Sequence, residues 1–116
     1  LEYNCRFGDP ETQVLLPLLD SDLYDVCVAC VDGELAGASV NWRAGFAATV
    51  VAAAPGYPEK YPKGLAITGL EAAKAVPRAF TSHAGTKLSG DGGVATSGGR
   101  VLAVTGTGPN LRSALA

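Results

Sequence analysis

The sequence has no methionine, one tryptophan and a single histidine, His83, among its 116 residues. One histidine cannot form a cluster of imidazole ligands around a metal ion, and a lone histidine beside a turn more often has a structural or surface role than that of a general base. Only 17% of the residues are charged, and a net charge of −2 excludes the basic field that binds nucleic acid. No run of about 18 apolar residues is present, so we expect no membrane span. The 47% of apolar residues is typical of a globular protein.

Cysteine is scarce too, with Cys5, Cys27 and Cys30 as the three in the chain. An odd number of cysteines and the lack of a secretory signal pattern favour free thiols in a reducing compartment, so we expect a cytoplasmic protein. Cys27 and Cys30 have C-x-x-C spacing, but a redox or zinc site needs a second pair or a strand-to-helix junction. We interpret them as small hydrophobic residues on the apolar face of a helix.

The richest chemistry lies in the first thirteen residues, which begin with an alternating pattern. Glu2, Asn4 and Arg6 alternate with apolar side chains, which predicts a strand with three polar groups on one face. A carboxylate and an amide two positions apart can both offer oxygen to a hard cation such as Mg²⁺, and a guanidinium beyond them can clamp a phosphate or carboxylate. The same pattern also fits the solvated face of an ordinary sheet, and periodicity alone does not choose between the two.

A helix is predicted directly after this strand. Gly8 breaks the strand, Asp9 can cap the helix, and Pro10 suits its first position. Pro17 ends or kinks that helix. A second helix follows, with Asp20 and Ser21 as possible caps and Gly33 at its end; the segment 1–36 thus reads as strand–helix–helix at the edge of a larger α+β unit.

The remainder, residues 37–116, is predicted to be a small antiparallel β unit rich in glycine, a barrel or a sandwich. Arg100 follows two glycines that would let a ligand approach the backbone, and an arginine there suits phosphate. On sequence alone, a solvent-facing arginine at a strand start is slightly favoured over this interpretation. Asn110 can cap a final helix. The expected strands are 38–42, 46–54, 65–67, 79–84, 86–88, 94–96 and 100–106, with a turn at Gly45 between the first two.

Seven short segments carry a resemblance to a known family. They are, in order, Glu2–Gln13 (EYNCRFGDPETQ), Leu15–Leu19 (LLPLL), Gly56–Pro58 (GYP), Lys63–Gly64 (KG), Ile67–Gly69 (ITG), His83–Thr86 (HAGT) and Gly98–Leu102 (GGRVL). With these segments the sequence resembles the phosphoribosylamine–glycine ligases, also called glycinamide ribonucleotide synthetases. The resemblance covers essentially the whole chain, and it rests on several independent motifs in one order.

The resemblance implies an ATP-grasp ligase that joins glycine to 5-phosphoribosylamine with ATP, giving glycinamide ribonucleotide, ADP and phosphate in purine biosynthesis. It implies Glu2 and Asn4 as a metal-ligand pair for Mg²⁺ or Mn²⁺, and Arg6 as a catalytic residue that stabilises the transferring phosphoryl group or the acyl phosphate. The residues expected near the substrate are Gly8, Asp9, Pro10 and Glu11, with Arg100 added on its own chemistry.

The resemblance also implies two parts, residues 1–36 as the edge of an ATP-grasp catalytic domain and residues 37–116 as a truncated C-terminal β domain. Both ends look cut, so we expect the N-terminal domain and most of the ATP-grasp domain to belong to the same polypeptide and this fragment to be inactive alone. The resemblance does not distinguish a mono-, bi- or trifunctional parent. The alternative interpretation is a non-catalytic, small β-barrel module for binding or scaffolding.

Overall fold

The computed structural model describes residues 4–116, which fold into two three-stranded antiparallel sheets with short helices around them. In the first sheet the strand order is β1-β6-β3, and in the second it is β2-β5-β4. The elements are α1 (Glu11–Leu15), a 3-10 turn (Leu16–Leu18), α2 (Leu23–Asp32), a second 3-10 turn (Leu35–Gly37), β1 (Phe46–Ala53), β2 (Ala66–Ile67), α3 (Leu70–Lys74), β3 (Ala79–His83), β4 (Thr86–Leu88), β5 (Val94–Thr96), β6 (Arg100–Gly108) and α4 (Leu111–Leu115).

Strand β6 is the centre of the larger sheet. Its Val104 lies opposite Val50 of β1 on one side and Thr81 of β3 on the other. The antiparallel, mostly β character of this half confirms the expected α+β class, and the apolar run at 46–54 forms a strand as predicted. The six strands are divided between two sheets, and no closed barrel is formed by the described residues.

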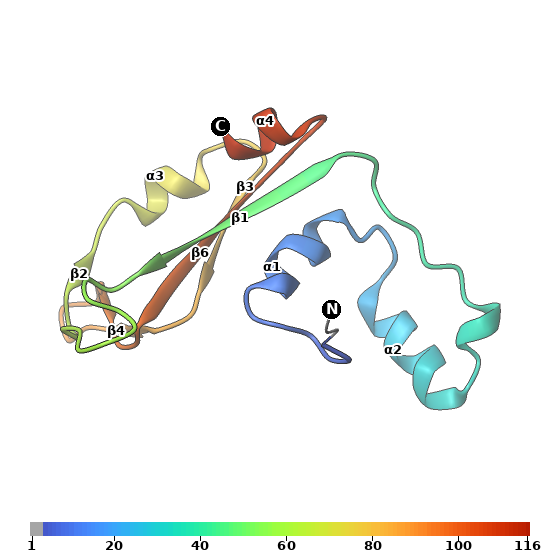
Figure 1. Ribbon diagram of the computed structural model, residues 1–116, viewed down its shortest axis with the longest axis horizontal. Helices are drawn as coiled ribbons and strands as arrows, with labels where there is room; N and C mark the ends of the chain where they lie inside the picture. Colours follow the sequence, from blue (N-terminus) through green and yellow to red (C-terminus); the bar gives the residue numbers. More distant parts are fainter. Residues whose placement is uncertain (1–3) are drawn as a thin grey trace.

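The two faces of the larger sheet are covered by different helices. On one face, a side chain at Gly106 would run into the carbonyl oxygen of Ala114, so glycine lets α4 lie directly on β6. On the opposite face, the hydroxyl of Thr105 donates to the carbonyl of Gln13 at 3.1 Å, which fixes α1 against the same strand. Figure 1 shows α1 on one side of β1 and β6, with α3 and α4 on the other.

Several local predictions are confirmed. Helix α1 gives way to a 3-10 turn that contains Pro17. Gly33 ends α2 in the left-handed conformation, with φ of 73°. Asn110 caps α4 by accepting the N–H of Ser113 at 2.9 Å. The cap of α2 is Asp22, whose carboxylate accepts the N–H of Tyr24 at 2.8 Å, and not the predicted Asp20 or Ser21.

Two predicted strands are wrong. Residues 4–7 contain a bend in place of a strand, and residues 1–3 lie outside the described residues. Residues 38–42 form only one isolated bridge, between Trp42 and Leu19, so Gly45 does not join a hairpin. Side-chain alternation predicts a strand only where another strand supplies ladder hydrogen bonds, and neither segment has such a neighbour here.

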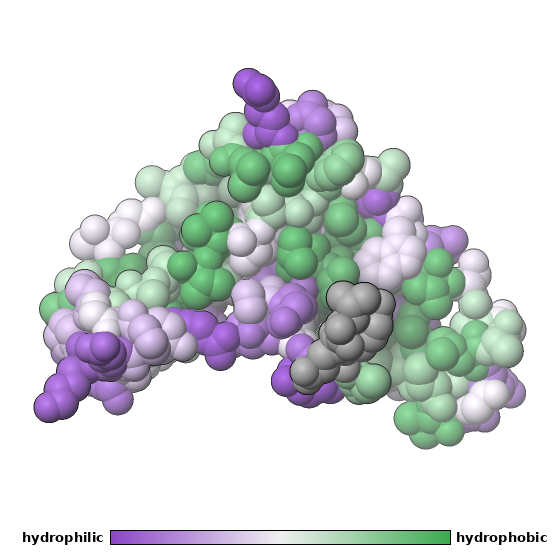
Figure 2. Space-filling model, in the orientation of Figure 1, coloured by the Kyte–Doolittle hydropathy of each residue, from purple (hydrophilic) through white to green (hydrophobic). Residues whose placement is uncertain are grey.

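A large area of apolar surface stays open. The chain exposes 8260 Å², whereas a compact monomer of this mass exposes roughly 5,900 Å². Its radius of gyration is 17.0 Å, against about 13.4 Å for a compact domain of this length. The predicted apolar stripe of α2 is largely uncovered, with Val31 86% exposed. Hydrophobic side chains lie open over the sheet below α4 and on the α2 lobe, which consists of α2 and the 3-10 turn after it (Figure 2). None of the helices in the described part is long and apolar enough to span a membrane.

Candidate functional site

The loop that leads into α1 is tightly folded around Gly8. Gly8 is buried, and its carbonyl accepts both the N–H of Thr12 at 3.0 Å and the Thr12 hydroxyl. The carboxylate of Glu11 lies directly over Gly8, where a side chain at Gly8 would collide with it. Residues 8–11, predicted to lie near the substrate, therefore form one closed turn of backbone.

The start of α1 differs from the prediction. Pro10, not Asp9, is the residue before the helix, and no side chain caps the first turn. The physical reason is that the Asp9 carboxylate has other partners. Its Oδ1 accepts from Nε2 of Gln13 at 2.9 Å, and its Oδ2 faces a cation.

That cation is Arg100, the first residue of β6. Its Nη2 lies 3.2 Å from Oδ2 of Asp9, and its Nη1 donates to the backbone carbonyl of Asp9 at 2.8 Å. The two residues are 91 positions apart in sequence. The structure thus brings together two residues that were predicted for the substrate end on separate grounds. Both side chains are about half exposed, 43% for Arg100 and 50% for Asp9, so the pair faces solvent on one side.

An open groove of about 590 Å³ runs beside this loop. Gly8, Asp9 and Gln13 line one wall, and Ser82 and Thr105 belong to the other. The Oε1 of Gln13 is buried here and lacks a hydrogen-bond partner among the described residues. Leu16, Pro17 and Phe80 complete a mostly apolar lining. The Asp9 loop therefore faces a space large enough for a small molecule, with a few hydroxyl and amide groups among apolar side chains.

The predicted metal and catalytic residues lie upstream of this turn. Glu2 falls outside the described residues. Asn4 and Arg6 are exposed, and Nη1 of Arg6 donates to the neighbouring carbonyl of Phe7 at 3.0 Å. Across residues 4–116 no three His, Cys, Asp or Glu side chains gather closely enough to hold a metal ion. The metal-ligand pair Glu2 and Asn4 stays a prediction, because only Asn4 of the two lies among the described residues.

The histidine and the paired cysteines considered in the sequence have local structural contacts or exposed positions in the fold. The Nδ1 of His83 lies 3.0 Å from the hydroxyl of Thr86, which links β3 to β4 across Gly85. Cys27 and Cys30 are exposed free thiols on α2, so the apolar face on which they were placed is uncovered here. In the turn between β4 and β5, hydrogen bonds from the Ser89 hydroxyl and the Gly93 N–H lower the pKa of Asp91 from its ordinary 3.8.

Comparison with known proteins decides the family. Residues 47–116 match the family model described as phosphoribosylglycinamide synthetase, C domain. This chain belongs to that family. It is 54% identical over 119 residues to a phosphoribosylamine–glycine ligase of Nostoc, covering 100% of this chain and 27% of the relative. It is 54% identical over 116 residues to the trifunctional purine biosynthetic protein adenosine-3 of Gallus gallus, covering 99% of this chain and 11% of that protein.

The phosphoribosylglycinamide synthetase C-domain fold is found in a solved relative as well. The crystal structure of the phosphoribosylamine–glycine ligase of Thermotoga maritima is similar, with a TM-score of 0.68, 38% identity, and coverage of 98% of this chain and 27% of that one. The resemblance read from the motifs is confirmed, while the chain spans only a small part of these relatives. Sequence reasoning missed the Asp9–Arg100 pair and the Gln13–Thr105 contact. The one signal for the pair was that both residues fall in resembling segments.

Proposed function

We propose that this chain is part of an ATP-dependent ligase that joins glycine to 5-phosphoribosylamine, forming glycinamide ribonucleotide with release of ADP and phosphate. The membership in the C-domain family carries the proposal, together with relatives named as phosphoribosylamine–glycine ligases over nearly the whole chain. The contact between Asp9 and Arg100 of β6 supports the proposal, because it connects the segment Glu2–Gln13 to the β unit.

The residues before Gly8 suit a hard cation in part. Asn4 is exposed and offers an amide oxygen, a ligand type that Mg²⁺ and Mn²⁺ accept, and Glu2 would be its partner two positions earlier. A bound cation would neutralise charge on the phosphates of ATP. Because such ions take about six oxygen ligands, two from this chain leave the rest to ATP, water and other parts of the polypeptide.

The chain's own groups supply charge and shape. In the proposed reaction the glycine carboxylate attacks the γ-phosphoryl group of ATP, and the amine of phosphoribosylamine then displaces phosphate from the acyl phosphate. The guanidinium of Arg6 is exposed and has one local hydrogen bond, to the carbonyl of Phe7, and in this proposal it stabilises the transferring group. The turn of Gly8, Asp9, Pro10 and Glu11 bounds the groove at the substrate end, beside Arg100.

The proposed division of the chain into two domains accounts for its large exposed surface. Residues 1–36 form the edge of an ATP-grasp domain, and residues 37–116 form the C-terminal β domain. The excess of roughly 2,400 Å² of exposed surface is what two further domains would cover. The exposed stripe of α2 is part of this open surface. We expect the fragment alone to be inactive and the parent protein to work in the cytoplasm.

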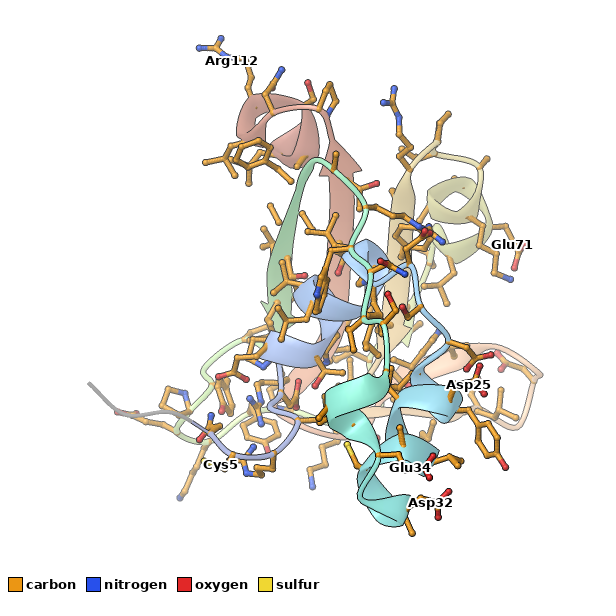
Figure 3. The ribbon with its side chains drawn as sticks, turned by 90° about the vertical axis from the view of Figure 1, so that its right-hand side faces the viewer. Cys5, Asp25, Asp32, Glu34, Glu71 and Arg112 are labelled. Carbon is orange, nitrogen blue, oxygen red and sulfur yellow. The ribbon has the colours of Figure 1, made fainter. Side chains whose placement is uncertain are left out.

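The test uses the longer protein that contains this chain. Glu2→Gln and Asn4→Ala are assayed for product formation that depends on ATP and glycine, with circular dichroism to verify folding. Both variants should lose nearly all turnover and keep their fold, because each removes a hard ligand. Glu34→Gln is the matched control, since Glu34 points into solvent on the α2 lobe and should leave turnover unchanged (Figure 3).

The two ways to fail are separate. Near-normal turnover in both variants would contradict the metal assignment while leaving the ligase activity intact. Failure of the wild-type protein to form product from ATP, glycine and phosphoribosylamine would contradict the proposed function itself. That second outcome would favour the binding or scaffolding module.

A further inference from the structure

Both terminal nitrogens of the Arg100 guanidinium contact one residue, Asp9. One donates to the Asp9 carbonyl at 2.8 Å, and the other pairs with the Asp9 carboxylate at 3.2 Å. A carbonyl and a carboxylate held by one guanidinium fix both the backbone and the side chain of Asp9. Such a contact restrains the loop more than a side-chain ion pair alone, because the peptide plane cannot turn without breaking it.

The backbone of Arg100 is itself held from several sides. Its carbonyl accepts the N–H of Gly85 at 2.8 Å. The preceding Gly99 is buried, its carbonyl accepts the N–H of Ala54 at 2.7 Å, and the ring of Tyr57 occupies the place of a side chain there. The start of β6 is therefore pinned between the strand β1 and the turn at Gly85.

The close packing around this point needs glycine on both sides. A side chain at Gly85 would stand 2.6 Å from Cα of Gly98 and 2.6 Å from the carbonyl oxygen of Arg100. The carbonyl of Gly85 accepts the N–H groups of Ser97 and Gly98 at 2.7 and 3.1 Å. Three of the segments that carry the resemblance thus meet here, GYP at 56–58, HAGT at 83–86 and GGRVL at 98–102.

On the Asp9 side, the contact lies close in sequence to the proposed metal and catalytic residues. The Asp9 carboxylate accepts a hydrogen bond from the Gln13 side chain, and the Gln13 carbonyl accepts one from Thr105 of β6. The turn is therefore held to β6 at two points, Arg100 and Thr105. Upstream of Asp9 only a few residues separate it from Asn4 and Arg6. A displacement of the Asp9 turn therefore moves the segment that carries the proposed metal and phosphoryl groups.

We propose that Arg100 is a positioning residue, which fixes the Asp9 turn and through it the Asn4–Arg6 segment, and that it does not bind the phosphate of a substrate. The Gly56–Pro58, His83–Thr86 and Gly98–Gly99 segments serve to hold Arg100 in place. The inference deepens the proposed ligase function and rests on it for the reaction, while the contact itself stands on the geometry. It replaces the expectation from sequence that Arg100 recognises an anion.

The experiment is a double-mutant cycle in the longer protein with Arg100→Ala, Asp9→Ala and both together. Steady-state kinetics give kcat and the KM for each substrate, and hydrogen exchange follows the peptide covering residues 8–15. Each single variant should lower kcat at least about tenfold, since misplaced reacting groups lose rate steeply. The KM for phosphoribosylamine should change less than about threefold, because the guanidinium does not touch it. The double variant should lose no more than the worse single one.

Controls keep the proposal falsifiable. Arg112→Ala is the matched control, since Arg112 lies near the start of α4 and points away from the sheet (Figure 3). It should leave both kcat and exchange unchanged. Arg100→Lys keeps the charge but not the paired donors, and it should recover only part of kcat while folding normally. Exchange at residues 8–15 should quicken in Arg100→Ala and in Asp9→Ala to the same extent.

The contrary results are distinct. A KM for phosphoribosylamine that rises with kcat unchanged, or losses that multiply in the double variant, would overturn the proposal in favour of direct phosphate binding. Unchanged exchange at residues 8–15 in Arg100→Ala would overturn the restraint, whether or not the protein is a ligase. If the wild type is inactive but exchange responds as expected, the contact stands and the proposed function fails.

Discussion

Substituting Gly85 by alanine should destabilise the protein far more than substituting Gly90. A methyl group at Gly85 would lie 2.6 Å from Cα of Gly98 and from the carbonyl oxygen of Arg100, whereas ordinary carbon contacts are about 3.5–4.0 Å. Both neighbours are backbone atoms held by hydrogen bonds, so neither can swing away as a side chain would. The two bends that contain Gly85 and Gly98 must separate by about 1 Å.

The magnitude follows from two opposing effects. Overpacking of this kind costs about 1–3 kcal/mol, and the weakened hydrogen bond from Gly85 N–H to Arg100 adds about 0.5–1.5 kcal/mol. Replacing glycine in the unfolded chain returns about 0.4–1 kcal/mol. A net loss of about 2 kcal/mol is expected, which would lower the urea midpoint by about 1 M. Gly90 has open space around its Cα, so Gly90→Ala should be neutral or stabilise slightly.

The assay is equilibrium unfolding in urea, with both variants measured beside the wild type. If Gly85→Ala were as stable as Gly90→Ala, the close approach of Gly85 to Gly98 would be wrong, and with it the packing that positions Arg100.

Three further results are expected. Thr105→Val should cost about 1–3 kcal/mol in the same titration, because its buried hydroxyl bonds both Gln13 and Thr49, and a cost below about 0.5 kcal/mol would argue against the α1 anchor. The pKa of Asp91 is lower in the folded protein than its ordinary 3.8, so its carboxylate contributes stability above pH 3.8. This stability is lost as the pH falls through the lower folded pKa. The difference in unfolding free energy between wild type and Asp91→Asn should therefore vanish at acidic pH. Hydrogen exchange should be slowest in β1 and β6 and fast throughout α2, and slow exchange in α2 would contradict its open placement in this chain.

Local features of the fold could be predicted because their causes are local. Gly33 and Asn110 mark helix ends through backbone conformation and side-chain capping, which need only neighbouring residues. The apolar run of β1 and the glycine turn before β5 likewise act at short range. The stretch 4–7 failed for the opposite reason, since a strand exists only beside a partner.

The candidate site depends on contacts that sequence does not encode at short range. Asp9 has the right neighbours for a helix cap, yet its carboxylate is taken by Arg100 from 91 positions away. No periodicity signals that pairing. The arrangement of strands was equally hidden, because β6 pairs with β1 and β3 while its sequence neighbour β5 belongs to the other sheet. The motifs identified the family, but they could not say that three of them converge on one arginine.

The most direct test of the account is the position of the cation in the longer protein that contains this chain. Crystals grown with Mn²⁺ and a non-hydrolysable ATP analogue would locate the ion by its anomalous scattering. We expect the peak to lie within coordination distance of the Asn4 amide oxygen and the Glu2 carboxylate, with the Asp9–Arg100 contact intact beside it. A peak held wholly by other residues, with Asn4 and Glu2 remote from the nucleotide, would contradict the claim that this segment is a wall of the ligase site.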